Sequence, residues 1–152
     1  MQLLWKLAQE QGIAICPLVS AEFLPGLDEM AAQFPKVTCV IDHLGHVESK
    51  DSADVANLLR LARHRNVHIK LSAFYKLGAR KPPYTDLAPL IRRLVEAFGP
   101  QRLMWGGDCP YQLQNGHTYH DSIELIRTRS DFLSAADGQA ILRDTAHRVF
   151  FG

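Results

Sequence analysis

The sequence predicts an α/β fold in which short buried strands alternate with amphipathic helices. Four apolar runs of five to seven residues, three of them rich in β-branched residues, have the composition of buried strands: residues 13–19, 37–43, 67–73 and 103–107. Between and after them, apolar residues recur with the 3.6-residue period of a helix. Strands and helices alternating at this spacing predict right-handed βαβ units and a parallel sheet.

Helices are expected before the first run and after each of the four runs. The first begins almost at residue 1, where an apolar stripe is formed by Leu3, Leu4, Leu7 and Ala8, and Gly12 suits its C-terminal end. Further apolar stripes predict helices at residues 23–34, 55–62, 87–98, 120–128 and 135–143. No internal sequence repeat or linker divides the chain, so residues 1–152 are expected to form a single domain.

The composition excludes several function classes. Seventeen Lys and Arg against sixteen Asp and Glu leave a formal charge of +1, which argues against nucleic acid or a membrane surface as a partner. Three cysteines cannot all pair in disulfides, which favours a reducing, cytoplasmic setting. No stretch approaches the roughly 18 apolar residues of a membrane span.

The third apolar run alternates polar and aliphatic side chains. Strand geometry places His68, Lys70 and Ser72 on one face and Ile69 and Leu71 on the other. This pattern predicts a polar cavity on one side and a helix layer on the other, as in a closed barrel. An independent flavodoxin-like sheet is the alternative, and it predicts strands buried on both faces.

Candidate chemistry lies in the irregular segments at residues 43–52, 74–85 and 107–118, which follow predicted strands, because α/β proteins bind ligands at the carboxyl ends of their strands. Asp108 follows two glycines that leave room for another group, and His43 ends the second run. A carboxylate and an imidazole at separate strand ends can activate a water or share a divalent metal. The same alternation rule places Asp42 on the face opposite His43.

The other reactive side chains have simpler explanations. The remaining histidines outside predicted strands are expected at the surface; they are His46, His64, His117, His120 and His147. Cys109 is expected to be a packed thiol, since no histidine forms a recognisable cysteine-hydrolase arrangement with it. The standard signatures of dinucleotide-binding, P-loop, α/β-hydrolase and zincin sites are absent from the sequence.

Four motifs, in this order and spacing, resemble the second half of the amidohydrolase-related TIM-barrel hydrolases. They are VIDHLGH (40–46), VHIKLSAFYKLG (67–78), RLMWGGDCPY (102–111) and FLSAADGQAILRDTAHRVF (132–150). The nearest members resemble 2-pyrone-4,6-dicarboxylate lactonase and sugar-lactone hydrolases. The resemblance implies the second half of a (β/α)8 barrel, with about four βα units that correspond to strands five to eight.

The resemblance also implies roles for individual residues. Asp108 would be the general base that activates the attacking water, and His43 would polarise the substrate carbonyl. In metal-dependent branches of the family, both would ligate a divalent ion, zinc or manganese. Lys70 and Tyr75 match positions that would meet a substrate carboxylate or hydroxyl. Cys109 departs from the aromatic residue common after the aspartate, which leaves the shape of the substrate open.

The chain lacks the HxH pair that the family carries on its first strand, and 152 residues fall short of the ~250 of a full barrel. The implied function is a hydrolase that directs water onto a lactone or related carbonyl of a small carboxylated molecule. The alternative is a catalytically silent half-barrel that acts as an assembly or binding module. Because a half-barrel has open edges, self-association or a missing N-terminal half is expected.

Overall fold

The computed structural model describes residues 1–48 and 53–152, so the end of the irregular segment at 43–52 lies outside the described residues. Its sheet has three parallel strands in the order β1 (Cys39–Ile41), β2 (Val67–Leu71) and β3 (Leu103–Trp105). Consecutive parallel strands that are also neighbours are the arrangement of a TIM barrel, whereas a flavodoxin-like sheet reverses its order around the first strand. The flavodoxin-like alternative is therefore wrong.

The first predicted strand joins the sheet at only one point. Ile15 forms an isolated parallel bridge with Cys39, and its carbonyl accepts a hydrogen bond from the Val40 N–H. Pro17 accepts from the Asp42 N–H but has no N–H of its own to donate. Among the described residues no strand pairs with the other side of this segment. The four-strand expectation is thus confirmed for three strands and wrong in extent for the first.

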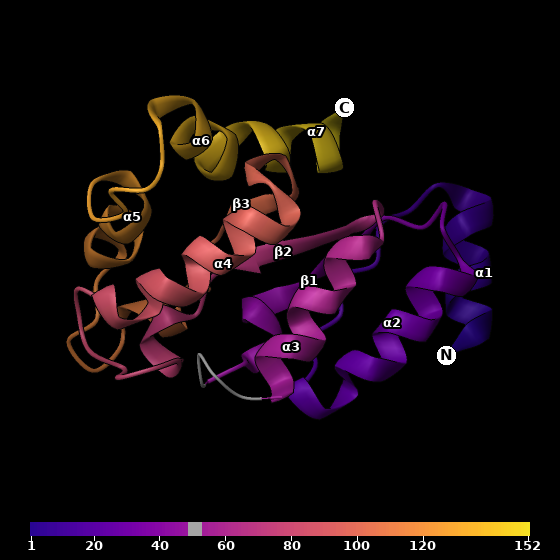
Figure 1. The fold of residues 1–152 in the computed structure, drawn as a ribbon, viewed down its shortest axis with the longest axis horizontal. Helices are drawn as coiled ribbons and strands as arrows, with labels where there is room; N and C mark the ends of the chain where they lie inside the picture. The colour runs from indigo at the N-terminus through magenta and orange to yellow at the C-terminus, as the bar shows by residue number, and fades with distance from the viewer. Residues whose placement is uncertain (49–52) are drawn as a thin grey trace.

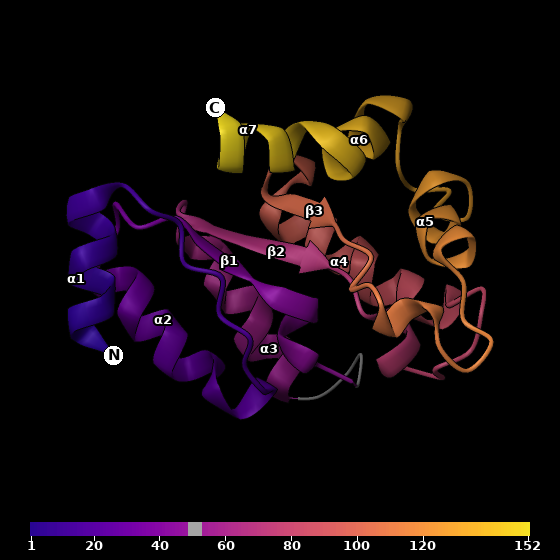
Figure 2. The same ribbon diagram turned by 180° about the vertical axis from the view of Figure 1, so that it is seen from behind.

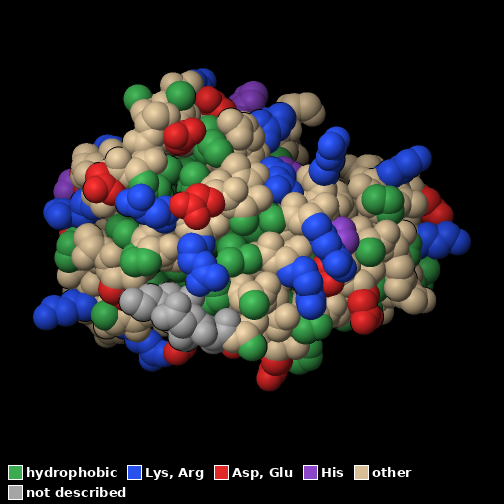
Figure 3. Space-filling model, in the orientation of Figure 1, with side chains coloured by type: hydrophobic (Ala, Val, Ile, Leu, Met, Phe, Trp, Pro, Cys, Tyr) green, Lys and Arg blue, Asp and Glu red, His purple; other side chains and the backbone are tan. Residues whose placement is uncertain are grey.

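Helices α3 and α4 cover one face of the sheet. Figure 1 shows α3 and α4 in front of the strands, and Figure 2, seen from behind, shows the strands in front. The helices are α1 (Gln2–Gln11), α2 (Leu24–Gln33), α3 (Ala53–Arg60), α4 (Ala88–Phe98), α5 (Tyr119–Arg127), α6 (Ala135–Gln139) and α7 (Thr145–Phe151). A π-helical segment at Ala140–Asp144 continues α6 into α7, which extends the last predicted helix to residue 151. On the face in Figure 3, basic and acidic side chains are interspersed.

The two faces of the sheet differ in chemistry, as the alternation in the third run predicts. Ile41, Ile69 and Leu103 are fully buried in the hydrophobic core shared with the helices. His68 and Lys70 lie on the opposite face, where the Phe150 ring of α7 lies 5.9 Å from Lys70 Nζ. This polar face leads to the carboxyl ends of the strands.

The helix α1 begins where the sequence predicts but buries a different side. It ends at Gly12, whose left-handed φ of 65° lets its N–H bond back to the Ala8 carbonyl. Trp5 is 2% exposed and packs against Phe34 with ring centroids 6.1 Å apart. The expected apolar stripe is therefore largely exposed to solvent, with exposed side chains at Leu3, Leu4 and Leu7. Burial of the large Trp5 ring determines this orientation.

No helix within residues 1–48 and 53–152 is both long enough and apolar enough to cross a membrane.

Candidate active site

Two site residues lie just after strands, where the backbone leaves the pleated conformation. After β1, residues Asp42–His46 form a short helical turn in which His43 has a φ of 53° and Gly45 a φ of 61°. After β3, Asp108 has a φ of 51°. Few residues other than glycine adopt such values, and they redirect a side chain away from the alternating pattern of the strand. Both side chains thereby reach the carboxyl edge of the sheet.

The prediction that Asp42 and His43 lie on opposite faces is wrong. Asp42 Oδ1 lies 2.7 Å from Lys70 Nζ, and His43 Nδ1 lies 2.8 Å from Ser72 Oγ. Since Lys70 and Ser72 share one face of the β2 chain, both Asp42 and His43 reach that face. The positive φ at His43 ends the alternation that the prediction assumed.

Two side chains lie against the Asp108 carboxylate. His43 Nε2 lies 3.7 Å from Oδ1, and the Tyr75 hydroxyl donates a hydrogen bond of 2.8 Å to Oδ2. The side chains of His43 and Asp108 are 14% and 20% exposed, so the pair is partly shielded from water. A separation of 3.7 Å exceeds hydrogen-bond length, so Oδ1 and Nε2 are not bonded to each other and both remain able to bind a molecule in front of them.

Burial determines the protonation states of two of these groups. It lowers the pKa of His43 below its ordinary value, against the opposing effect of Asp108, so the ring is neutral at pH 7. Burial and the hydrogen bond to Asp108 raise the pKa of Tyr75 to about 12, so its hydroxyl remains a donor. When the Ser72 hydroxyl donates to Nδ1 of His43, Nε2 carries the ring proton and presents it to the Asp108 side.

These groups line a pocket of about 390 Å³ with walls formed by Leu18, His43, His46, Tyr75, Lys76, Asp108 and Tyr111. The Lys76 side chain is exposed and adds a positive charge, while Leu18 and Tyr111 add apolar surface. His46 is held by a 3.0 Å contact between Nδ1 and the Val19 carbonyl. The pocket therefore offers an acceptor for a proton and donors for a small anionic molecule.

Three of the four predicted site residues lie together in this pocket: His43, Tyr75 and Asp108. Lys70 is not among its lining residues, because its ammonium group is paired with Asp42. The substrate contact expected for Lys70 stays a prediction.

The sequence analysis missed two contributors to the site. His46, expected at the surface, is partly buried and lines the pocket, because the turn after β1 brings it within 5.5 Å of the His43 ring centroid. Ser72 was placed on the correct face by alternation, yet nothing in the sequence paired it with His43 across 29 residues. The repeat of histidine three residues after His43 was the available signal for His46.

Five of the remaining surface and packing expectations can be compared with the structure. His64 and His117 are partly buried and hydrogen-bonded, so their assignment to the surface is wrong. His120 and His147 are exposed, as expected. The Cys109 thiol is exposed rather than packed, because it follows Asp108 in a loop outside the core.

The described residues do not fit a complete metal centre. A catalytic zinc site uses about three protein ligands, and His43 and Asp108 supply two. Within residues 1–48 and 53–152, no group of three or more His, Cys, Asp or Glu side chains is arranged to hold a metal ion. No chemical step is therefore derived through a metal.

Comparison with known proteins places this geometry in a family. A family model described as amidohydrolase matches residues 2–152. The chain belongs to the amidohydrolase family. This finding confirms the resemblance drawn from the four sequence motifs, and it accounts for a polar pocket at the carboxyl ends of parallel strands.

Individual relatives of this amidohydrolase chain are longer than it. It is 33% identical over 140 residues to a 2-pyrone-4,6-dicarboxylate hydrolase of Comamonas testosteroni, covering 84% of this chain and 45% of the relative. It is 32% identical over 108 residues to an L-fucono-1,5-lactonase of Burkholderia ambifaria, covering 69% and 37%. The chain thus matches less than half the length of either curated relative.

Solved structures give the same picture. An amidohydrolase from Burkholderia multivorans, crystallised with bound zinc, superposes with a TM-score of 0.83 at 28% identity, over 95% of this chain and 55% of that one. A putative 2-pyrone-4,6-dicarboxylic acid hydrolase from Pseudomonas putida superposes with a TM-score of 0.79 at 25% identity. The α/β fold is therefore that of part of an amidohydrolase barrel.

Proposed function

We propose that this chain carries the second half, strands five to eight, of a barrel hydrolase that cleaves a lactone or related carbonyl of a small carboxylated molecule. The observation that carries the proposal is the Asp108 carboxylate, held by Tyr75 and facing the neutral His43 ring in one pocket. The names of three relatives, two lactone hydrolases and a pyrone dicarboxylate hydrolase, support the choice of substrate class.

In the proposed reaction Asp108 is the general base. A water beside Oδ1 gives a proton to the carboxylate while its oxygen bonds to the carbonyl carbon, and the carbonyl π electrons move to oxygen. The Nε2–H of His43 donates to the oxyanion that forms. When the tetrahedral intermediate collapses, the ring C–O bond breaks and the Asp108 carboxyl group returns its proton to the leaving oxygen.

Substrate binding is assigned to side chains around this pair. The Tyr75 ring and hydroxyl form one wall, and the exposed Lys76 ammonium at the pocket supplies a charge for a substrate carboxylate. Lys70 is kept as a further candidate, reached by a substrate that displaces it from Asp42. A zinc or manganese ion at His43 and Asp108 would need ligands from beyond the described residues.

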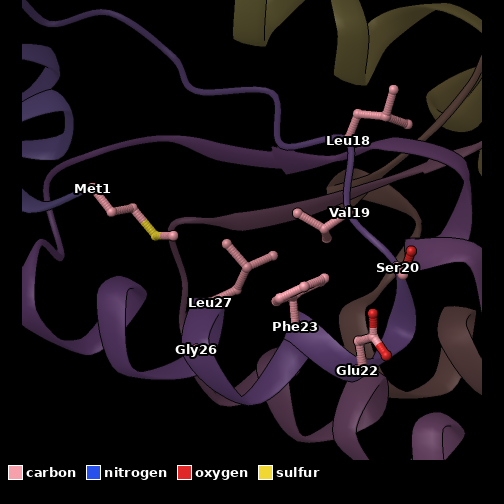
Figure 4. A pocket seen from close by; sticks show the side chains of 8 residues that line it. All are labelled: Met1, Leu18, Val19, Ser20, Glu22, Phe23, Gly26 and Leu27. Carbon is pink, nitrogen blue, oxygen red and sulfur yellow. The ribbon is translucent and has the colours of Figure 1, made fainter.

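Further βα units are part of the proposal, supplied by a second copy of the chain or by a polypeptide that forms the N-terminal half of the barrel. An apolar pocket of about 420 Å³ lies beside the segment around Ile15, which joins the sheet by a single bridge. Figure 4 shows the side chains that surround it, including Met1, Val19, Phe23 and Leu27. Leu18 and Phe23 there are 64% and 57% exposed. Apolar surface beside an open strand edge is typical of a surface buried by association.

Light scattering on the purified chain tests this part of the proposal. A stable dimer supports association between copies. A monomer that binds a co-expressed N-terminal half of a related amidohydrolase supports a separate polypeptide as the source of the further βα units. A monomer that binds neither contradicts the proposal.

The reaction is tested by assaying a panel of lactones with the purified chain, alone and with an N-terminal half, each with and without Zn²⁺ or Mn²⁺. Asp108→Asn is expected to lower turnover by about 10³-fold, because an amide cannot accept the proton. Asp131→Asn, at a side chain that is 92% exposed, is the matched control. Full activity in Asp108→Asn would overturn the assignment. No turnover from any folded form would favour the silent binding module.

The predicted cytoplasmic location stays a prediction.

A further inference from the structure

Asp108 lies in a closed circuit of contacts that begins and ends on this residue. Its carbonyl accepts a 3.1 Å hydrogen bond from the Gln112 backbone N–H, and Gln112 Nε2 donates to the Tyr84 hydroxyl at 3.0 Å. The Tyr84 hydroxyl lies 2.7 Å from Nδ1 of His117. The His117 ring packs 5.9 Å from the Tyr75 ring, and Tyr75 donates to the Asp108 carboxylate at 2.8 Å.

The direction of each hydrogen bond follows from the fixed donors and acceptors. Gln112 Nε2 also faces the Thr118 carbonyl at 3.1 Å, and since a carbonyl only accepts, this atom is the amide nitrogen. Tyr84 therefore accepts from Gln112, and its own proton is free to be donated to Nδ1 of His117. In this arrangement Nδ1 of His117 accepts, and the ring N–H lies at Nε2.

The circuit joins two loops that would otherwise hold Asp108 and Tyr75 separately. Tyr75 and Tyr84 come from the loop after β2, whereas Asp108, Gln112 and His117 come from the loop after β3. Tyr84 and Gln112 are both 0% exposed, and hydrogen bonds shielded from water hold their geometry more firmly than exposed ones. The positive φ of Asp108 is costly for an aspartate and needs surrounding structure to maintain it.

We propose that Tyr84 and His117 are positioning residues, which hold the Tyr75 hydroxyl against Asp108 and thereby orient the carboxylate for water activation. The catalytic consequence rests on the proposed function of Asp108. The positioning itself is a property of the folded chain and is measured without a substrate.

Two variants remove the same hydrogen bond from opposite sides while keeping an aromatic ring in place: Tyr84→Phe and His117→Phe. The readout is the ¹³Cζ chemical shift of Tyr75 at pH 7, followed by NMR of ¹³C-labelled tyrosine, of which the chain has four. The resonance is expected to move toward its position in Asp108→Ala, in which the Tyr75 hydroxyl has no carboxylate partner. The double variant should shift it no further than either single variant, because all three lose one bond.

His120→Gln, at an exposed histidine near His117, is the control and should leave the Tyr75 resonance at its wild-type position. Circular dichroism and thermal unfolding establish that each variant is folded. An unchanged Tyr75 resonance in folded Tyr84→Phe and His117→Phe overturns the positioning role. Where the wild type hydrolyses a lactone, both variants should lower kcat by about tenfold with a smaller change in KM. A displaced Tyr75 resonance in a chain without turnover supports the positioning role and contradicts the proposed function.

Discussion

Two aspartates near opposite ends of the sheet have contrasting surroundings. Asp28 in α2 has a side chain that is 8% exposed and contacts three basic groups from the segment before β2. Arg60 Nε lies 3.3 Å away, an Arg63 guanidinium nitrogen 2.7 Å and His64 Nε2 2.8 Å. Asp108, beyond the end of β3, is contacted instead by the Tyr75 hydroxyl and the neutral His43 ring.

The difference agrees with the proposed roles, in which Asp28 is structural and Asp108 is the general base. The positive charges around Asp28 attract its negative charge, so its oxygens are committed to joining α2 with the end of α3. Asp108 has one oxygen held by a neutral donor, and the other faces a pocket. A carboxylate with neutral neighbours and access to a ligand is the one able to accept a proton from water.

The largest expected difference is in stability. Asp28→Asn should lower the free energy of unfolding by about 2 kcal/mol, because it removes the buried negative charge that the basic side chains contact. The Arg60 and Arg63 side chains are 47% and 56% exposed, and solvent around them limits the loss. Urea denaturation at pH 7 measures it. Asp108→Asn serves as the comparison and should change stability by less than about 1 kcal/mol. An equal loss in both variants would remove the distinction.

The second prediction concerns alkaline pH. Because the pKa of Tyr75 is raised to about 12 in the folded chain, the unfolded chain loses this proton first, and stability falls between about pH 10 and pH 12. Tyr75→Phe should lose about 1 kcal/mol less than the wild type over this range, a value limited by solvent around the partly buried ring. Urea denaturation at pH 9 and pH 11 measures the difference. Parallel losses in the two proteins would argue against the Tyr75–Asp108 contact.

The fold was predictable where the pattern is local and periodic. Alternating strands and helices, the Gly12 helix end and the polar face of β2 all follow from residues close together in sequence. The extent of the first strand was not predictable, because a strand at Ile15 extends only where neighbouring strands pair with it on both sides. The orientation of α1 depended on the packing of Trp5 against Phe34, which the stripe of leucines does not reveal.

The site was predictable in its principal residues and not in their support. Asp108 and His43 occur in recognisable motifs at strand ends. Their actual orientation depends on positive φ angles that strand alternation ignores. The hydrogen bond from Tyr84 to His117 joins residues 33 positions apart, and only the folded loops bring them together.

A smaller effect is expected at acidic pH. Since burial lowers the pKa of His43, the unfolded chain binds a proton that the folded chain excludes, and stability declines as pH falls below about 6.5. His43→Gln should show a shallower decline between pH 7 and pH 5, measured by thermal unfolding. His120→Gln, at an exposed ring, should follow the wild type. A His43→Gln curve that parallels the wild type would mean that the ring is as easily protonated in the folded chain as in the unfolded one.

The smallest effect is expected beside Asp108 itself. The Cys109 thiol is exposed and is not among the residues that line the pocket, so Cys109→Ser should alter stability by less than about 0.5 kcal/mol. Any lactone turnover should change by less than about twofold. Urea denaturation and the lactone assay check both values. A large loss of turnover with unchanged stability would mean that the thiol contributes to the reaction. The difference in reactivity between the two aspartates would then depend on Cys109 as well as on the Asp108 carboxylate.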